Sequence, residues 1–190
     1  MAAQAQRHCD WRQVLTAALL IFAIAVAIAA WTVLCIFLAD KFPSEEPKYS
    51  VAVAAVAGLD PARDLSDRGR PTISPVFNVT VHIDNRRNAY NRACAPDLST
   101  AEVSYGDAFL GRGTLPKVCA GKRREAEGVA KAWGQDVVMP WFLRDQLAGQ
   151  LAVGEAAVDV QVRLDPSSLL VCKAKIGGGL SRCREPESAW

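Results

Sequence analysis

The residues with the most defined chemistry in this chain are its six cysteines. Two of them come early, and four follow in the remainder of the chain, at Cys94, Cys119, Cys172 and Cys183. Zinc sites usually contain pairs of cysteines separated by only a few residues, and these four cysteines contain no such pair. Their even number and wide spacing therefore favour disulfide bonds in an oxidising compartment, and no metal site is expected.

Four cysteines can pair in three ways, and their spacing alone leaves all three open. We favour Cys172–Cys183 together with Cys94–Cys119, because the first pair would close a short turn around the glycines at 177–179.

Catalytic chemistry is not expected from the side chains present. The two histidines are His8 and His82, and the second falls on a strand face that the sequence predicts to be exposed. A Ser-His-Asp or Cys-His arrangement in the later part of the chain would have to use His82, and no Gly-x-Ser-x-Gly sequence supplies a nucleophile. The carboxylates show no recognisable pairing, so the chain is predicted to be a non-enzyme without a cofactor.

Asn78-Val79-Thr80 is an N-glycosylation sequon, which acts only in a domain that enters the secretory lumen. Apolar residues at 77, 79, 81 and 83 alternate with polar ones, which predicts a strand with one buried face. Asn78 would then point to solvent, where a glycan can be accommodated.

Two short clusters are basic, Arg86-Arg87 and Lys122-Arg123-Arg124. Clusters of this size are most often solvated loops. The functional alternative is a contact patch for anionic lipid headgroups or for an acidic cell-wall polysaccharide.

An apolar stretch at residues 14–39 without any charged residue must position all of these groups. A helix needs about 20 apolar residues to cross the hydrocarbon core of a bilayer, and this stretch is longer. It is apolar around its whole circumference, whereas a soluble helix keeps a polar face. We predict an uncleaved transmembrane helix that binds the chain to the lipid bilayer. The alternative is a cleaved signal peptide, although the apolar run is longer than its usual core.

The distribution of basic residues does not settle the orientation of this helix. Arg7 and Arg12 precede it, and Lys41 and Lys48 follow at a similar distance, so the positive-inside rule gives close to a tie. The even number of later cysteines and the sequon favour a cytoplasmic N-terminus and an extracytoplasmic domain. With a net charge of +2 over 190 residues, the chain offers no electrostatic case for nucleic-acid binding.

Five segments follow from these patterns. They are a cytoplasmic head at 1–13 that is expected to be disordered, the transmembrane helix at 14–39, a spacer at 40–48, a β domain at 49–183 and a polar tail at 184–190. Strands are predicted at 49–57, 77–83, 101–105, 108–115, 129–138, 158–164 and 170–176. Residues 117–128 are expected to form a mobile charged connection. Short alternating strands of this number predict an antiparallel β-sandwich of the fibronectin or immunoglobulin kind.

Residues 140–151 are the best candidate for a helix within the β domain, with Pro140 at its first position. Leucines recur every four residues from Leu143 and would face the core, with Arg144 outside. The aromatic residues Trp133, Trp141 and Phe142 are expected to pack in the core or against this helix, and an exposed recognition patch is the alternative.

The chain resembles plant membrane proteins of the second late embryogenesis abundant subgroup, which overlaps the harpin-induced-like proteins. The resemblance rests on the single membrane helix, the sequence PVFNVTVHIDN at 75–85, VSYG at 103–106 and the stretch from Gly111 to Pro116. It covers roughly residues 10–183, although Asp84-Asn85-Arg86 stands where the family usually has Asn-Pro-Asn. The resemblance implies a fibronectin-like β-sandwich, also called the water stress and hypersensitive response domain, and a role in plant defence or water stress.

The expected function is therefore that of a non-enzymatic single-pass protein of the plasma membrane. Its extracellular β domain would contact proteins or the cell wall. Two alternatives stay open: a general stress-protective membrane protein without a specific partner, and a secreted soluble ligand released by cleavage after the apolar stretch.

Overall fold

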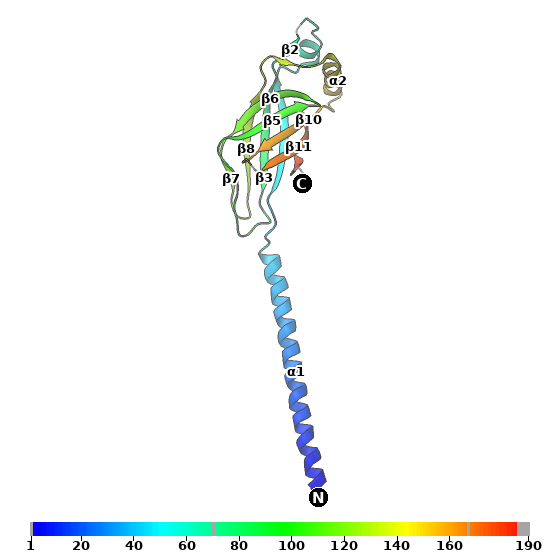
Figure 1. Ribbon diagram of the computed structural model, residues 1–190, viewed down its shortest axis with the longest axis vertical. Helices are drawn as coiled ribbons and strands as arrows, with labels where there is room; N and C mark the ends of the chain where they lie inside the picture. The colour runs from blue at the N-terminus through cyan, green and yellow to red at the C-terminus, as the bar shows by residue number, and fades with distance from the viewer. Residues whose placement is uncertain (1, 70, 167, 186–190) are drawn as a thin grey trace. The chain divides into compact units, whose positions relative to one another are not determined.

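Figure 1 shows the computed structural model of the chain, which describes residues 2–69, 71–166 and 168–185, with side chains from Trp11 onward. The chain divides into two compact units, Met1–Pro43 and Ser44–Trp190. The first unit is built around one helix. The second contains the strands of the described residues.

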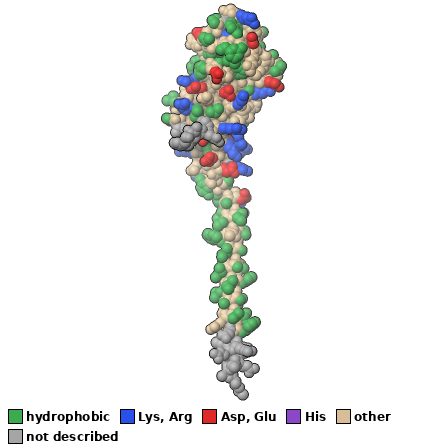
Figure 2. Space-filling model, turned by 45° about the vertical axis from the view of Figure 1, so that its right-hand side comes forward, with side chains coloured by type: hydrophobic (Ala, Val, Ile, Leu, Met, Phe, Trp, Pro, Cys, Tyr) green, Lys and Arg blue, Asp and Glu red, His purple; other side chains and the backbone are tan. Residues whose placement is uncertain are grey.

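Helix α1 (Ala2–Lys41) is 40 residues long. Its segment Trp11–Lys41 is long and apolar enough to cross a membrane, with a mean hydropathy of 2.8 and no part buried inside the protein. Figure 2 shows the hydrophobic side chains that the helix leaves exposed on the face in view. The helix expected at 14–39 is present. The head at 1–13 was expected to be disordered, and for residues 2–13 this is wrong, because the alanine and glutamine residues at 2–6 are compatible with helix and let it extend toward the N-terminus.

Within the described residues, the second unit has twelve strands and two helical segments. The strands are β1 (Lys48–Ala57), β2 (Thr72–Ile73), β3 (Val76–Asp84), β4 (Ala93–Ala95), β5 (Ser99–Tyr105), β6 (Ala108–Leu115), β7 (Val118–Ala120), β8 (Glu125–Trp133), β9 (Val137–Val138), β10 (Ala157–Arg163), β11 (Leu169–Lys175) and β12 (Ser181–Arg184). The helical segments are the π-helix η1 (Pro61–Leu65) and the α-helix α2 (Trp141–Ala152).

Eight strands form a closed barrel in the order β1-β12-β11-β10-β5-β6-β8-β3, with β3 pairing back to β1. The ladders between them are antiparallel. The predicted β-sandwich is therefore wrong. Alternation of apolar and polar residues predicts which side of each strand is buried, and that pattern is the same in a sandwich and in a barrel. Closure depends on pairing between segments far apart in the chain.

The inward-facing side chains fill the barrel, as expected for a small barrel of eight strands. Strand β3 contributes Phe77, Val79, Val81 and Ile83, all fully buried. Small residues lie opposite the larger ones. Phe77 pairs with Ala132 of β8, and Val79 pairs with Ala130 of the same strand. Other strands of the barrel contribute further buried apolar side chains, including Val51, Val53, Val103, Leu110, Val158, Val160, Val162, Leu170 and Ala174.

The two ends of the barrel carry different loops. At one end, which we call the tether end, the domain begins at Ser44 and the register pairs Lys48 with Asp84 and Asp84 with Glu125. At the other, which we call the cap end, β1 finishes, and helices η1 and α2 pack together there, with the small β2–β9 sheet beside them (Figure 1). The small β4–β7 sheet lies outside the barrel ladder.

Most predicted strands are present, with two corrections in the middle of the chain. The expected mobile connection at 117–128 instead contains β7 and the start of β8, and β8 ends at Trp133 rather than continuing to 138. The charged side chains of Glu125 and Glu127 hid the start of β8, because an outward-facing strand position accepts a charge as readily as a loop does. The hairpin predicted around Gly106-Asp107 is present, with Gly106 at a φ of 56°.

Candidate functional site

Two cysteine pairs are joined in the structure, Cys94–Cys119 and Cys172–Cys183. They are the pairs that the sequence analysis favoured. In each pair the two cysteines are directly opposite each other on neighbouring antiparallel strands, with Cα atoms 4.1 Å and 4.2 Å apart. The first disulfide links the two strands of the small β4–β7 sheet, and the second links β12 to β11. Cys35, in helix α1, is a free cysteine.

The two basic clusters meet at the tether end of the barrel. Loop 85–92 and turn 121–124 together contain six basic residues and no acidic one: Arg86, Arg87, Arg92, Lys122, Arg123 and Arg124. We call these six the basic patch, and all of them are exposed. Buried Asn85 joins the two segments, since its side-chain Nδ2 donates to the carbonyls of Asn91 and Gly121 at 2.8 Å and 3.0 Å. Arg92 is the member that sequence analysis did not single out.

Backbone hydrogen bonds hold the patch in one piece. The Asn85 amide donates to the Arg124 carbonyl at 3.1 Å, and the Arg123 amide donates to the Asn88 carbonyl at 3.0 Å. Two residues of the patch form ion pairs. Arg86 pairs with Glu125 at 2.6 Å, and Arg87 pairs with Glu45 at 2.7 Å. Within the described residues, Lys122 and Arg124 have no carboxylate at ion-pair distance.

Arg86 also holds the pKa of Asp84 well below its ordinary value. A side-chain hydrogen bond from the Arg86 guanidinium, partly offset by burial, lowers the Asp84 pKa from 3.8 to about 2. The carboxyl is ionised more readily in the folded state than in the unfolded state, so this interaction stabilises the domain above about pH 4. The contribution is lost as the pH falls through about 2.

We expect Arg86→Gln to raise the Asp84 pKa toward 3.8 and to reduce the loss of stability between pH 4 and pH 2. Carboxyl-resolved NMR titration measures the pKa, and urea unfolding at a series of pH values measures stability. Arg92→Gln serves as the matched control. An Asp84 pKa that stays near 2 in Arg86→Gln would contradict the assignment.

Helix α2 at the cap end is anchored by a buried arginine. Arg144 was expected on the outer face, and the structure corrects this, because its side chain is fully buried. Its guanidinium donates to the Pro71 carbonyl at 2.5 Å and lies 4.7 Å from the ring centroid of Trp141. Leu147, one turn further along, is also fully buried. Arg144 thereby joins the start of α2 to the segment that precedes β2, so the helix is fixed against the end of the barrel.

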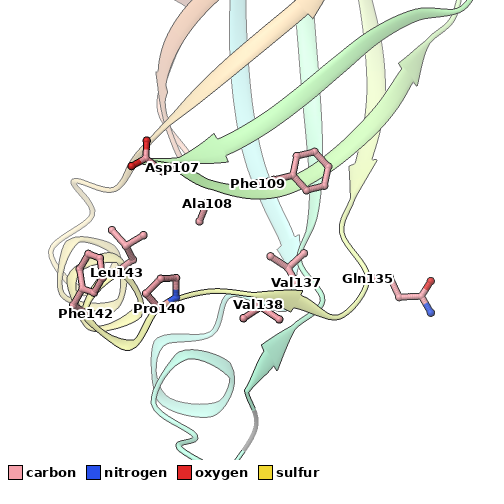
Figure 3. Close-up of a pocket in the computed structure, with 9 residues that line it drawn as sticks. All are labelled: Asp107, Ala108, Phe109, Gln135, Val137, Val138, Pro140, Phe142 and Leu143. Atoms are coloured by element: carbon pink, nitrogen blue, oxygen red, sulfur yellow. The ribbon is translucent and has the colours of Figure 1, made fainter.

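An apolar cleft of about 470 Å³ opens beside this helix. Figure 3 shows its lining, in which Phe109 of β6 and Leu143 of α2 lie on either side of Ala108. Three large side chains around it are exposed: Phe109 by 46%, Val138 by 72% and Phe142 by 69%. Phe109 lies in β6, and Val138 and Phe142 lie in the consecutive elements β9 and α2. Exposed apolar side chains that gather around a cleft mark interaction sites more often than isolated ones do.

The aromatic residues that were expected in the core are instead exposed. Trp133, Trp141 and Phe142 all have exposed side chains, and Phe142 lines the apolar cleft. Phe109 was missed by the sequence analysis. The available signal was its place in β6, where it is the one large apolar residue on the outward-facing positions.

Among the described residues, the lining of the cleft contains one charged side chain, and it is acidic. Asp107 lines it within the β5–β6 turn, and the polar Gln135 lies on the same lining. The described part of the chain places no lysine or arginine in the lining. The cleft therefore combines a mainly apolar lining with one acidic side chain.

Asn78 and His82 both lie on β3. Asn78 is exposed on the outer surface of the barrel, between Ala54 of β1 and Lys131 of β8. His82 is more covered than predicted, with 13% of its side chain exposed, and its Nδ1 lies 3.1 Å from the Glu127 carboxylate.

Among the described residues, no three histidine, cysteine, aspartate or glutamate side chains lie close enough to hold a metal ion. Comparisons of the chain with models of protein families, with curated proteins and with solved structures find no match.

Proposed function

We propose that this protein is a non-enzymatic, membrane-anchored recognition module. Helix α1 holds it in a bilayer, and the barrel domain binds a protein partner through the apolar cleft at its cap end. The observation that carries the proposal is the clustering of Phe109, Val138 and Phe142, all exposed, around that cleft. Large apolar side chains are costly to leave in water, and a partner that covers them gains the free energy of their burial.

The domain is proposed to lie outside the cytosol, with the N-terminus of α1 in the cytoplasm. Two disulfides between opposed strands support this side of the membrane, because disulfides persist in oxidising compartments and are rare in the cytosol. The exposed sequon asparagine, Asn78, is compatible with passage through the secretory lumen. The plasma membrane is the proposed destination.

In cells that glycosylate secretory proteins, we expect the full chain to carry one N-linked glycan at Asn78. Asn78→Gln should abolish the mobility shift that endoglycosidase treatment produces on a denaturing gel. Asn91→Gln, at an exposed asparagine outside any sequon, should leave the shift unchanged. The same mobility with and without the enzyme for the unaltered chain would contradict lumenal passage of the domain.

The proposed occupant of the cleft is an apolar segment of another protein that carries lysine or arginine beside its apolar side chains. The apolar lining selects for the apolar part. The carboxylate of Asp107 in the lining favours basic flanks and disfavours acidic ones. Within the domain, the cleft lies at the cap end, and Ser44, the first residue of the domain, lies at the opposite end.

The biological setting is proposed from the family resemblance. Similarity to the second late embryogenesis abundant subgroup and to harpin-induced-like proteins suggests a role in plant defence or in the response to water stress. A surface recognition module suits either role, since both begin with events outside the cell.

Selection from a random peptide library tests the occupant. The full chain, held in phosphatidylcholine nanodiscs, is used as bait for phage-displayed peptides, and the enriched peptides are then measured individually. We expect enrichment of apolar peptides with basic flanks, and a loss of affinity of about thirtyfold in Phe142→Asp. Asp107→Lys should shift the preference of the flanks toward acidic residues. Val153→Asp, at an apolar residue 70% exposed outside the cleft lining, is the matched control.

Two results would contradict the proposal. One is enrichment of peptides whose binding is equally strong to Phe142→Asp and to the unaltered chain. The other is the absence of any enriched sequence class, which would favour a general protective protein without a specific partner.

A further inference from the structure

The basic patch is tied by hydrogen bonds to the first residues of the domain. Ser44 forms a β-bridge with Asn88, the Glu45 amide donates to the Arg87 carbonyl at 3.0 Å, and the Glu45 carboxylate pairs with Arg87. Loop 85–92 therefore cannot move away from the start of the domain without breaking these bonds. Turn 121–124 is held in place with this loop, because it is hydrogen-bonded to Asn85 and Asn88.

The start of the domain is in turn close to the end of the membrane helix along the chain. Helix α1 ends at Lys41, and only Phe42 and Pro43 separate it from Ser44. Three residue steps of extended chain span at most about 11 Å. This limit is covalent and holds for any orientation of the domain. The headgroup layer on each side of a bilayer is itself about 5–7 Å thick. If α1 spans the bilayer, the attachment point of the patch is held within reach of that layer.

Composition makes the patch suited to anionic headgroups. It carries six positive charges on two segments that contain no carboxylate. Lysine and arginine side chains are attracted to an anionic membrane surface when they lie within a Debye length of about 8 Å. The carboxylates that pair with Arg86 and Arg87 reduce the charge, and they leave Lys122 and Arg124 outside the ion pairs of the described residues.

An exposed tyrosine adds a second feature of membrane interfaces. Tyr90 lies in the same loop as Arg86, Arg87 and Arg92, and its side chain is exposed. Tyrosine is enriched at the level of lipid headgroups, where its ring meets apolar material and its hydroxyl meets water. The loop thus combines basic residues with an interfacial aromatic residue.

We propose that the basic patch binds anionic phospholipid headgroups of the same bilayer that holds helix α1, and so sets the domain on the membrane by its tether end. This orientation presents the cap-end cleft to the surroundings. The inference rests on the membrane anchor of the proposed function and adds a second, electrostatic contact to it. It is independent of the identity of the cleft's partner.

Lysine footprinting of the full chain in nanodiscs tests the contact. The chain is reconstituted in discs of phosphatidylcholine, or of phosphatidylcholine with phosphatidylserine, and treated with a water-soluble acylating reagent. Peptide mass spectrometry then gives the acylation rate of each lysine. We expect Lys122 to react about fivefold more slowly in the anionic discs at low salt, and to regain its rate at high salt. Lys173, exposed at the cap end, is the reference within the same molecule and should react equally in both discs.

Variants that replace arginine with glutamine distinguish protection by the basic patch from a general effect of the membrane on lysine reactivity. In Arg123→Gln/Arg124→Gln the protection of Lys122 should fall by at least half. In the matched variant Arg63→Gln/Arg68→Gln, which removes one exposed arginine within helix η1 and one shortly after it, the protection should be unchanged. An unchanged Lys173 rate in both variants reports that the barrel is intact.

Equal Lys122 rates in neutral and anionic discs would overturn the inference and leave the anchor standing. Protection by soluble polygalacturonate in neutral discs, with none from phosphatidylserine, would also overturn it and point to a wall polysaccharide. Co-elution of the chain with the nanodiscs in size-exclusion chromatography tests the membrane anchor separately. If the chain does not co-elute, the anchor itself fails, and this inference fails with it.

Discussion

Replacing both Cys172 and Cys183 with alanine is expected to lower the free energy of unfolding by about 3 kcal/mol, because the disulfide constrains an 11-residue loop in the unfolded chain. The structural consequence is expected to be larger than the loop suggests. Strand β12 has four residues and lies between β11 and β1 in the barrel. It forms two residue pairs with each neighbour, so the disulfide is a main support of the strand that closes this part of the barrel.

Urea unfolding and hydrogen exchange of the full chain in mild detergent measure these effects. We expect faster exchange at the amides of β12 and at the facing positions near Ser50 of β1. The matched variant is Cys94→Ala/Cys119→Ala, whose 25-residue loop predicts a loss of about 3.5 kcal/mol. In that variant faster exchange should be confined to β4 and β7. If β12 keeps its protection without Cys172 and Cys183, the disulfide does not hold the barrel closed.

Gly113→Val is expected to destabilise the domain by about 3 kcal/mol or more, because there is no space for a side chain at this position. Gly113 of β6 lies against the backbone of Lys131 in β8, and a Cβ added there would overlap its carbonyl group. Gly111 and Gly134 face similar backbone contacts where β6 and β8 meet. Backbone atoms cannot be moved aside as a flexible side chain can, so the two strands would have to separate.

Gly149→Ala provides the control for loss of glycine itself. Gly149 lies in α2, and a Cβ there meets no atom within 4 Å. Alanine should stabilise the helix by about 0.5–1 kcal/mol. Both variants are measured by urea unfolding of the full chain. A Gly113→Val variant as stable as the unaltered protein would show that β6 and β8 do not approach as closely as described.

The strands could be predicted from local patterns, and the barrel could not. The alternation of apolar and polar residues at 77–83 and at 158–164 predicts two strands with one buried face each. The structure has β3 and β10 at these positions. Closure depends on β3 pairing with both β1 and β8, and on the short β12 filling the gap between β1 and β11. These contacts join segments far apart in the chain, and no local pattern encodes them.

In the candidate sites too, local sequence patterns could be recognised, whereas contacts between distant segments could not. The sequence clusters Arg86-Arg87 and Lys122-Arg123-Arg124 are visible separately, but their union depends on the hydrogen bonds of Asn85, an unremarkable loop residue in the sequence. The burial of Arg144 could not be foreseen, because its partner, the Pro71 carbonyl, is a backbone group without a sequence signal. Phe109 had a usable signal, since a large aromatic residue at an outward strand position is exposed unless another element covers it.

The most direct test of a membrane-anchored extracytoplasmic barrel is protease protection of the full chain, tagged at its C-terminus, in sealed microsomes. If α1 is retained and the domain lies in the lumen, protease should leave a tagged fragment that contains both the helix and the barrel, and detergent should abolish the protection. Digestion of the barrel in sealed microsomes would place it in the cytosol. A protected fragment that lacks the helix would show that the apolar segment is cleaved, and either result would contradict the anchored arrangement.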